Sequence, residues 1–206
     1  MFDIGAHEGN FTDTFLANEA GRVLSIEPQV DVFESLQNRF RDNDDVICLC
    51  CAAGASPDFL PIYLCVQANT LSSLTEKWMF GRFKGYAFVK SDYRVEVVTL
   101  DSLIEKYGEP DYIKIDVEGY EFQVLAGLST AINSISFEHT GEYKGDAFAC
   151  CDRLLQLGDY EFSYSRGDVE SLETAWLPWE EFYPIIFSAF DEEGMWGDVF
   201  ARLALR

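Results

Sequence analysis

The sequence has few basic residues, and this shortage limits what the protein can bind. Its 206 residues include 15 Lys and Arg against 36 Asp and Glu, which gives a formal net charge of -21. Binding to a nucleic-acid backbone depends on cationic side chains that displace counterions from the phosphates. A chain with so many carboxylates repels that backbone. We therefore expect neither DNA nor RNA as a partner.

Long hydrophobic runs are also missing. No stretch of about 18 apolar residues occurs, so we predict no membrane-spanning helix and no membrane partner. The first residues lack the basic start and the apolar run of a signal peptide. From these two absences we expect a cytoplasmic location.

Cysteine pairs with the spacing of a structural zinc site are the third absence. Such a site needs CxxC-type pairs, and the sequence contains none. We interpret all six cysteines as reduced thiols and predict no resident metal. They are Cys48, Cys50, Cys51, Cys65, Cys150 and Cys151.

What the sequence does contain is a regular alternation of strand and helix patterns. With 48% hydrophobic and 25% charged residues it has the composition of a globular protein, and we expect one domain over residues 1–206. Alternating strands and helices indicate an α/β fold, a doubly wound and mostly parallel sheet with helices on both faces. A helix with Asp101 as its N-cap follows one of the strands. The expected strands are 1–4, 22–27, 46–52, 95–100, 112–116, 135–138, 160–164 and 199–203, with 59–66 as an added one.

A glycine-containing turn follows the first expected strand. Gly5 and Gly9 flank it, and glycine lets a backbone turn sharply and approach a ligand closely. The spacing differs from the GxGxxG pattern that places a pyrophosphate on a helix N-terminus. Because Asp3 and Glu8 are also present, the turn suits a cationic ligand better than a diphosphate. The alternative is a simple strand-turn-helix connection.

Acidic residues lie at or just after the ends of the expected strands 22–27 and 112–116. Glu27 ends the first of these, where an acid in such folds accepts hydrogen bonds from ribose hydroxyls; the alternative is a solvated acid. Asp116 ends the other strand, and Glu118 and Glu121 follow it. These acids could hold an ammonium group, orient a substrate hydroxyl or bind a divalent metal, or they could serve only the first turn of a helix.

His139 follows the fifth expected strand at the same edge of the sheet. An imidazole titrates near neutral pH, so His139 joins Asp116 and Glu118 as a candidate catalytic base. The alternative is a histidine that caps a loop.

The least regular stretch is residues 67–94, which we consider a candidate substrate lid. Five of the 15 basic residues lie here among aromatic side chains, which could stack on a ring and pair with an acidic group. The alternative is a charged surface loop. The five are Lys77, Arg82, Lys84, Lys90 and Arg94.

Five motifs, taken together and in this order, resemble the FkbM family of S-adenosylmethionine-dependent methyltransferases. They are DIGAHEGNFT at 3–12, SIEP at 25–28, VTLDSL at 98–103, IKIDVEGYEFQVLAG at 113–127 and ISFE at 135–138. The resemblance implies a Rossmann-like class I fold with seven strands in the order 3-2-1-4-5-7-6, the last inserted strand being antiparallel. It also implies S-adenosylmethionine as cofactor and O-methylation of a small-molecule or sugar hydroxyl.

The resemblance further implies roles for single residues. Asp3, Gly5, His7 and Gly9 would line the methionine and loop side, and His7 stands where the family usually has asparagine. Glu27 would hold the ribose and Ala52 would lie near the adenine. Asp116 would face the methionine end and the substrate.

Two other classes of function share part of this pattern. A nicotinamide-dependent oxidoreductase would also have the strand, the glycine turn and the ribose acid, although the third glycine is missing here. A non-catalytic cofactor-binding module would retain the cleft without the chemistry. The sequence leaves the acceptor and the oligomeric state open, with a homodimer as one option.

Overall fold

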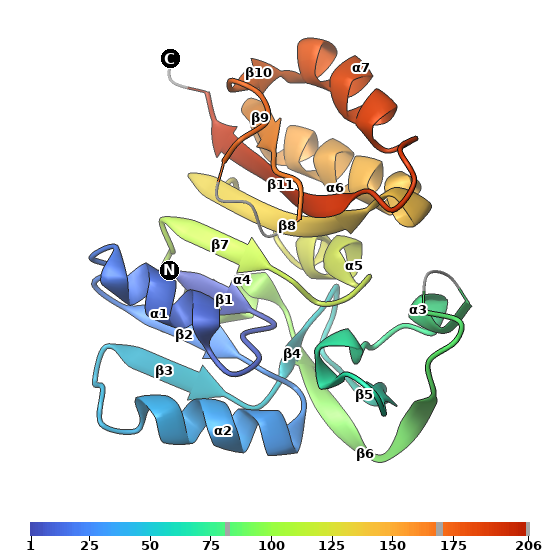
Figure 1. The fold of residues 1–206 in the computed structure, drawn as a ribbon. Coiled ribbons are helices and arrows are strands. Elements are labelled where there is room, and N and C mark those ends of the chain that lie inside the picture. Colours follow the sequence, from blue (N-terminus) through green and yellow to red (C-terminus); the bar gives the residue numbers. More distant parts are fainter. Residues whose placement is uncertain (81–82, 168–170, 205–206) are drawn as a thin grey trace.

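In a computed structural model, which describes residues 1–80, 83–167 and 171–204, strands and helices alternate along most of the chain (Figure 1). The strands are β1 (Phe2–Ile4), β2 (Val23–Ile26), β3 (Val46–Leu49), β4 (Ala52–Ala53), β5 (Asp58–Cys65), β6 (Phe88–Val98), β7 (Tyr112–Ile115), β8 (Ser134–Thr140), β9 (Tyr160–Tyr164), β10 (Leu177–Pro178) and β11 (Trp196–Leu203). The helices are α1 (Asn10–Ala17), α2 (Val30–Phe40), α3 (Lys77–Phe80), α4 (Leu100–Tyr107), α5 (Glu121–Ala126), α6 (Lys144–Leu157) and α7 (Trp179–Ala189). Two short 3-10 helices are η1 (Asn69–Leu71) and η2 (Gly141–Tyr143).

The large sheet has the predicted strand order. Its strands follow one another as β10-β9-β11-β8-β7-β1-β2-β3. Five neighbouring strands, β3, β2, β1, β7 and β8, pair in parallel. β11 is inserted antiparallel between β8 and β9. This is the expected order 3-2-1-4-5-7-6, with the short β10 added beside β9 as an eighth strand.

The prediction of one continuous strand over Val46 to Ala52 is wrong. β3 ends at Leu49, Cys50 is exposed, and Ala52–Ala53 form β4 in a second sheet of order β4-β6-β5. β3 is also the edge strand of the large sheet and is half-buried, whereas we expected burial on both faces. An apolar run predicts buried residues but not which sheet they join, and here the run contributes β3 to one sheet and β4 to the other.

The second sheet accounts for two other predicted strands. The added strand predicted at 59–66 is β5, and the strand predicted at 95–100 is the last part of the longer β6. Figure 1 shows this small sheet beyond the arrowheads of β2, β3 and β7, so it faces the carboxyl ends of the parallel strands. In open α/β sheets these ends are where ligands bind.

The N-cap predicted for α4 is wrong by two residues. Thr99, not Asp101, is the cap, and its hydroxyl accepts a hydrogen bond from the Ser102 N–H at 3.1 Å. Asp101 lies inside the helix and its carboxylate accepts from the Ser129 N–H at 2.8 Å. Both residue types can cap a helix, and the backbone position where the strand ends decides between them.

Helices cover both faces of the large sheet. Figure 1 shows α1 in front of the central strands and α5 and α6 behind them. The main core combines strand residues such as Ile4 and Ile115 with Leu125 of α5 and Leu154 of α6. A smaller cluster packs Leu36 and Phe40 of α2 against the turn after β1.

A row of buried polar side chains crosses the sheet under α1. Asp3, Ser25 and Lys114 stand at matching register positions on β1, β2 and β7. The Thr12 hydroxyl donates to Asp3 Oδ2 at 2.7 Å and lies 2.7 Å from the Ser25 hydroxyl. Buried polar groups need such partners, so this row fixes α1, and with it the glycine turn, on the sheet.

The six cysteines are free thiols, as predicted. Four of them are buried, Cys48 is half-buried and Cys50 is exposed. None of the helices in the described ranges combines the length and the apolar run that a membrane crossing requires.

Gly5 generates the first prediction. It has φ +85°, and a Cβ at this position would lie 1.8 Å from the Asp116 carbonyl oxygen. Gly5→Ala combines this overlap with a left-handed backbone, so we expect a loss of about 3–5 kcal/mol in the free energy of unfolding. Urea denaturation followed by circular dichroism measures it.

The matched control is Gly145→Ala in the first turn of α6, where a Cβ would meet no atom within 4 Å. Alanine favours a helix over glycine, so this variant should be unchanged or more stable by up to about 1 kcal/mol. Equal stability of the two variants would contradict the close contact at Gly5.

Candidate active site

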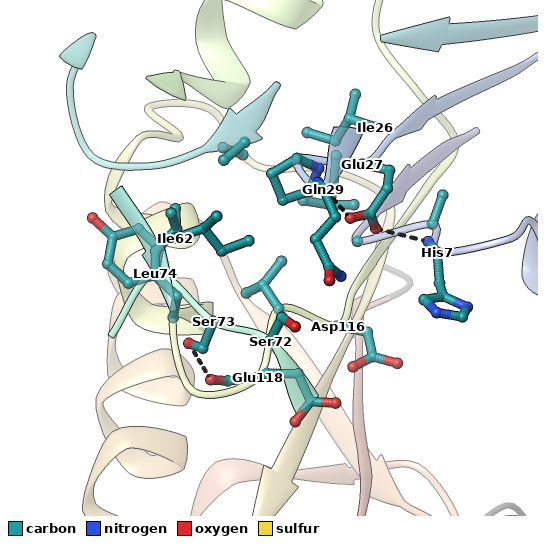
Figure 2. A pocket seen from close by; sticks show the side chains of 18 of the residues that line it. His7, Ile26, Glu27, Gln29, Ile62, Ser72, Ser73, Leu74, Asp116 and Glu118 are labelled. Atoms are coloured by element: carbon teal, nitrogen blue, oxygen red, sulfur yellow. Dashed lines mark hydrogen bonds between the residues drawn. The ribbon is translucent and has the colours of Figure 1, made fainter. Parts of the chain in front are cut away.

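A pocket of about 210 Å³ opens at the carboxyl ends of β1, β2 and β7. Figure 2 shows Glu27 and Gln29 on one side of it, Ile62 and Leu74 on the opposite side, and Asp116 and Glu118 at one end. The pocket therefore has a polar wall, an apolar wall and an acidic end.

The glycine turn forms part of the polar wall. Gly5 and His7 line the pocket, whereas Gly9 packs against α2, where a Cβ would be 2.4 Å from the Phe40 ring. All three residues have positive φ, and His7 at φ 48° is the one with a side chain. Asparagine, aspartate and histidine adopt this left-handed conformation more readily than most residues, so His7 fits this position.

Glu27 is buried at the centre of the polar wall. Its Oε2 accepts a hydrogen bond from the His7 N–H at 3.0 Å, and its Oε1 accepts one from the Gln29 N–H at 2.8 Å. Burial raises the pKa of Glu27, and these hydrogen bonds act in the opposite direction. Only 3% of Glu27 is exposed, so it is not the solvated strand-end acid of the alternative interpretation.

The apolar wall comes from three strands and the segment after β5. Ile26 ends β2, Ala52 and Ala53 form β4, and Ile62 lies in β5. Apolar side chains such as these commonly line the pockets that bind small molecules. Ala52 thus lines the pocket, and its place near an adenine stays a prediction.

Asp116 lies at the acidic end and is committed to an ion pair. Its Oδ2 accepts from the Lys114 ammonium at 2.6 Å, and that nitrogen lies 3.9 Å from the centre of the Phe11 ring. Burial alone would lower the pKa of Lys114, but the carboxylates of Asp116, Asp198 and Asp3 outweigh it and raise the pKa. Lys114 is therefore a charged, buried partner that orients Asp116.

Asp116, Glu118 and Glu138 form a cluster of carboxylates. One oxygen from each lies within 4.8 Å of the others, a spacing that could hold a divalent cation. Burial and then the charges of Asp116, Glu118 and Glu121 raise the pKa of Glu138 well above its usual range. Sequence reasoning missed Glu138 as a site residue, although it ends the last of the five motifs.

The loop that carries Glu118 is held from two sides. The Ser73 hydroxyl donates to the Glu118 carbonyl oxygen at 2.7 Å, and Glu121 Oε1 accepts from the Gly119 N–H at 2.9 Å. Burial raises the pKa of Glu121 to about 7. Glu121 therefore shapes the loop, while Glu118, at φ 57°, lines the pocket.

Three of the predicted site residues do not line this pocket: Gly9, which packs on Phe40 of α2, Asp3 and His139. Asp3 is buried under α1 in the polar row of the sheet. His139 lines a separate small cavity on the other side of Glu138, with its ring 4.6 Å from that of Phe190. The pocket thus brings together Gly5, His7, Glu27, Ala52, Asp116 and Glu118 of the predicted set.

The candidate lid, residues 67–94, contributes Thr70, Ser72, Ser73 and Leu74 to the pocket. Sequence reasoning did not single out these four, because small polar residues without periodicity carry no distinctive signal.

The basic residues of the candidate lid bind elsewhere or are not described. Lys77 pairs with Asp146, Lys90 lies over the Tyr63 ring, and Arg94 donates to the Phe59 carbonyl oxygen. Arg82 lies outside the described residues, and Lys84 is exposed. Among the described lining residues, none of these cations faces the pocket.

The strand order with its inserted antiparallel β11, and the pocket at the carboxyl edge, define a class I methyltransferase fold. The model of the methyltransferase FkbM domain matches residues 3–164. The chain therefore belongs to the FkbM methyltransferase family, and S-adenosylmethionine is the cofactor of such domains.

A curated relative is also a methyltransferase. The hexuronic acid methyltransferase AglP of Haloferax volcanii is 26% identical over 147 residues, covering 66% of this chain and 53% of the relative. The chain thus spans about half the length of this curated relative.

Two solved structures share the fold. The crystal structure of methyltransferase FkbM from Methylobacillus flagellatus KT matches with a TM-score of 0.59 and 17% identity, over 98% of this chain and 42% of that one. The precorrin-6y C5,15-methyltransferase from Geobacter metallireducens GS-15 matches with a TM-score of 0.52 and 9% identity, over 99% of this chain and 79% of that one.

His139 generates the second prediction. Burial lowers its pKa from 6.5 to about 3, so the folded protein keeps the ring neutral where the unfolded chain protonates it. The neutral ring therefore contributes stability above pH 6.5, and this contribution is lost as the pH falls from 6.5 toward 3. In an NMR titration, the His139 ring signals should stay at their neutral positions until the pH approaches 3.

A His139→Gln variant should lose less stability than the wild type over the same pH range, because glutamine does not titrate. Comparing the two proteins cancels the titration of the acidic groups that they share. A His139 midpoint near the ordinary value would contradict the buried, neutral ring.

Proposed function

We propose that the domain catalyses S-adenosylmethionine-dependent O-methylation of a hydroxyl on a small polyhydroxylated molecule such as a sugar. The observation that carries this is the placement of the buried Glu27 carboxylate and the acidic end, Asp116 and Glu118, in one pocket. The name of the relative AglP, a hexuronic acid methyltransferase, supports a sugar as acceptor.

The residues of the pocket fit the cofactor. Each Glu27 oxygen accepts one backbone N–H and keeps further acceptor capacity for the two ribose hydroxyls. Ile26, Ala52 and Ile62 offer an apolar surface to the adenine. The acidic end suits a ligand with ammonium and sulfonium charges, and the described lining residues include no lysine or arginine for a pyrophosphate.

The main contribution of the chain to the reaction is alignment. When bound, the cofactor supplies an electrophilic methyl group, and transfer needs the acceptor oxygen in line behind it. Well-oriented reactants gain effective molarities of order 10⁵ M or more, and charge is dispersed in this transition state. Asp116, held by Lys114, and the Glu118 loop, held by Ser73, are fixed groups that orient the two reactants.

The acceptor hydroxyl must also lose its proton. Glu138 is the best-matched base, because burial and the neighbouring carboxylates raise its pKa, which makes its ionised form a stronger base, and its carboxylate stands beside Asp116 and Glu118. Asp116 is less suited to this step, since its Oδ2 is already occupied by the Lys114 ammonium at 2.6 Å. Ser72 and Leu74, which belong to the candidate lid, line the pocket and help to exclude water from it.

The third prediction concerns the nucleoside half of the ligand. By titration calorimetry we expect the protein to bind S-adenosylhomocysteine and to show no comparable binding of NADH. Glu27→Gln removes the charge from the ribose acceptor, so we expect about 10- to 100-fold weaker binding of S-adenosylhomocysteine. Glu34→Gln, on the exposed face of α2, is the matched control and should bind as the wild type does.

Because Glu27 also holds the His7 and Gln29 amides, unfolding curves of both variants accompany the calorimetry. Preferential binding of NADH, or full affinity in a folded Glu27→Gln variant, would overturn the assignment of this pocket. Binding of the cofactor without turnover of any sugar would favour a non-catalytic module.

A further inference from the structure

The two residues that hold the Glu27 carboxylate also contact the candidate lid. Their backbone amides donate to the two Glu27 oxygens, and their side chains both reach Asn69. His7 Nε2 lies 3.2 Å from Asn69 Oδ1, and Gln29 Nε2 donates to the Asn69 carbonyl oxygen at 3.0 Å. Figure 2 shows the His7 and Gln29 side chains extending beyond the Glu27 carboxylate, one on each side of it. Glu27, His7, Asn69 and Gln29 therefore form a closed ring of hydrogen bonds.

The bond between His7 and Asn69 depends on the side chain at each position. The Asn69 Oδ1 atom is an amide carbonyl oxygen, which only accepts, so His7 Nε2 carries the hydrogen. The Gln29 bond ends on the Asn69 backbone and does not require an asparagine there. The His7 bond is thus the part of the ring that a substitution at position 69 removes.

Residues 69–74, which we call the lid segment, run from this ring to the acidic end of the pocket. Four of them, Thr70, Ser72, Ser73 and Leu74, line the pocket. At the far end the Ser73 hydroxyl donates to the Glu118 carbonyl oxygen at 2.7 Å, a bond that Figure 2 also shows. Because Asn69 fixes the near end, the ring sets where the lid segment lies over the pocket.

The two bonds to Asn69 are weak when taken singly. Asn69 is exposed, so water competes for both of its oxygens. The bonds become stronger when His7 and Gln29 are held still, and a ligand that binds Glu27 holds them through their amides. Coupling between two binding events is reciprocal, so closure of the lid segment then strengthens ligand binding by the same factor.

We propose that Asn69 is a positioning residue of the cofactor site, which joins the lid segment to His7 and Gln29, so that ribose binding at Glu27 and closure of the lid segment favour each other. This inference rests on the proposed function, in which Glu27 holds the ribose. It assigns to the candidate lid a role in cofactor binding that acts through the polar wall of the pocket.

Titration calorimetry with S-adenosylhomocysteine measures the contribution of Asn69. Asn69→Ala removes the acceptor for His7, so we expect binding to be about three- to tenfold weaker. Asn69→Asp keeps an acceptor oxygen at the same place, and its affinity should stay within about twofold of the wild type. Asn38→Ala, on the exposed face of α2, is the matched control and should bind as the wild type does.

A double-mutant cycle tests whether Asn69 acts through His7. In His7→Asn the new side chain tolerates the left-handed backbone and ends closer to it than the imidazole does, so the bond to Asn69 is lost. We expect Asn69→Ala to weaken binding in the wild type and to have almost no further effect in His7→Asn. An equal loss in both backgrounds would refute the link through His7.

Hydrogen exchange of the lid segment separates positioning from a purely structural role. The Leu71 and Ser72 amides donate to the Ala68 and Asn69 carbonyl oxygens, so they report whether the segment is ordered. We expect S-adenosylhomocysteine to slow their exchange about tenfold or more in the wild type, and about threefold or less in Asn69→Ala. A residue that stabilised only the fold would change the exchange rates by the same factor with and without the ligand.

The outcomes distinguish this inference from the proposed function. If the wild type does not bind S-adenosylhomocysteine, or if a folded Glu27→Gln variant binds it with full affinity, the pocket is wrongly assigned. If Glu27→Gln weakens binding while Asn69→Ala binds as the wild type does, the pocket assignment stands and the role of Asn69 is refuted. Ligand protection of the lid segment that is equal in Asn69→Ala and the wild type would refute it as well.

Discussion

The close contact between Gly5 and Asp116 is the constraint on which the site depends. The Asp116 N–H donates to the Ile4 carbonyl oxygen at 2.9 Å, and the Asp116 carbonyl oxygen lies where a Cβ of residue 5 would be. On the other side, the Gly5 N–H donates to the Ile26 carbonyl oxygen at 3.1 Å. Gly5 therefore joins the ends of three strands, and the pocket forms where their chains separate.

This junction explains why Glu27 and Asp116 face one ligand. The same β2 end that binds the Gly5 amide continues into Glu27, whose carboxylate accepts the His7 N–H. The end of β7 continues into Asp116, whose direction is set by the buried Lys114. Both acids are thus oriented by the backbone and by a neighbouring charge before any ligand arrives, which reduces the entropy lost on binding.

Local patterns in the sequence were sufficient for the parts of the site that follow a strand directly. The glycine turn, Glu27 and the Asp116 loop each stand next to an apolar run, and the order of the strands followed from the family resemblance. The break after Leu49 and the second sheet were missed because they depend on the pairing of β4 with β6, which is distant in the sequence, and the Thr99 cap was missed because it depends on where β6 ends. His139 was expected in the main pocket, and alternation along β8 separates its side chain from that of Glu138.

In the proposed reaction Glu138 accepts the proton of the acceptor hydroxyl, and the neighbouring carboxylates favour this proton transfer once the cofactor has lost its positive charge. Before transfer, a cation bound beside Asp116 and Glu118 offsets the repulsion that raises the pKa of Glu138, so its ionised form is favoured and it can accept a proton. Transfer of the methyl group turns the sulfonium into a neutral thioether and releases one proton from the acceptor. The repulsion among the acids then favours protonated Glu138, so the positive charge lost at sulfur is replaced by a proton on the same cluster. A site in which three carboxylates outnumber the Lys114 ammonium is therefore suited to a reaction that removes the cationic charge of its cofactor.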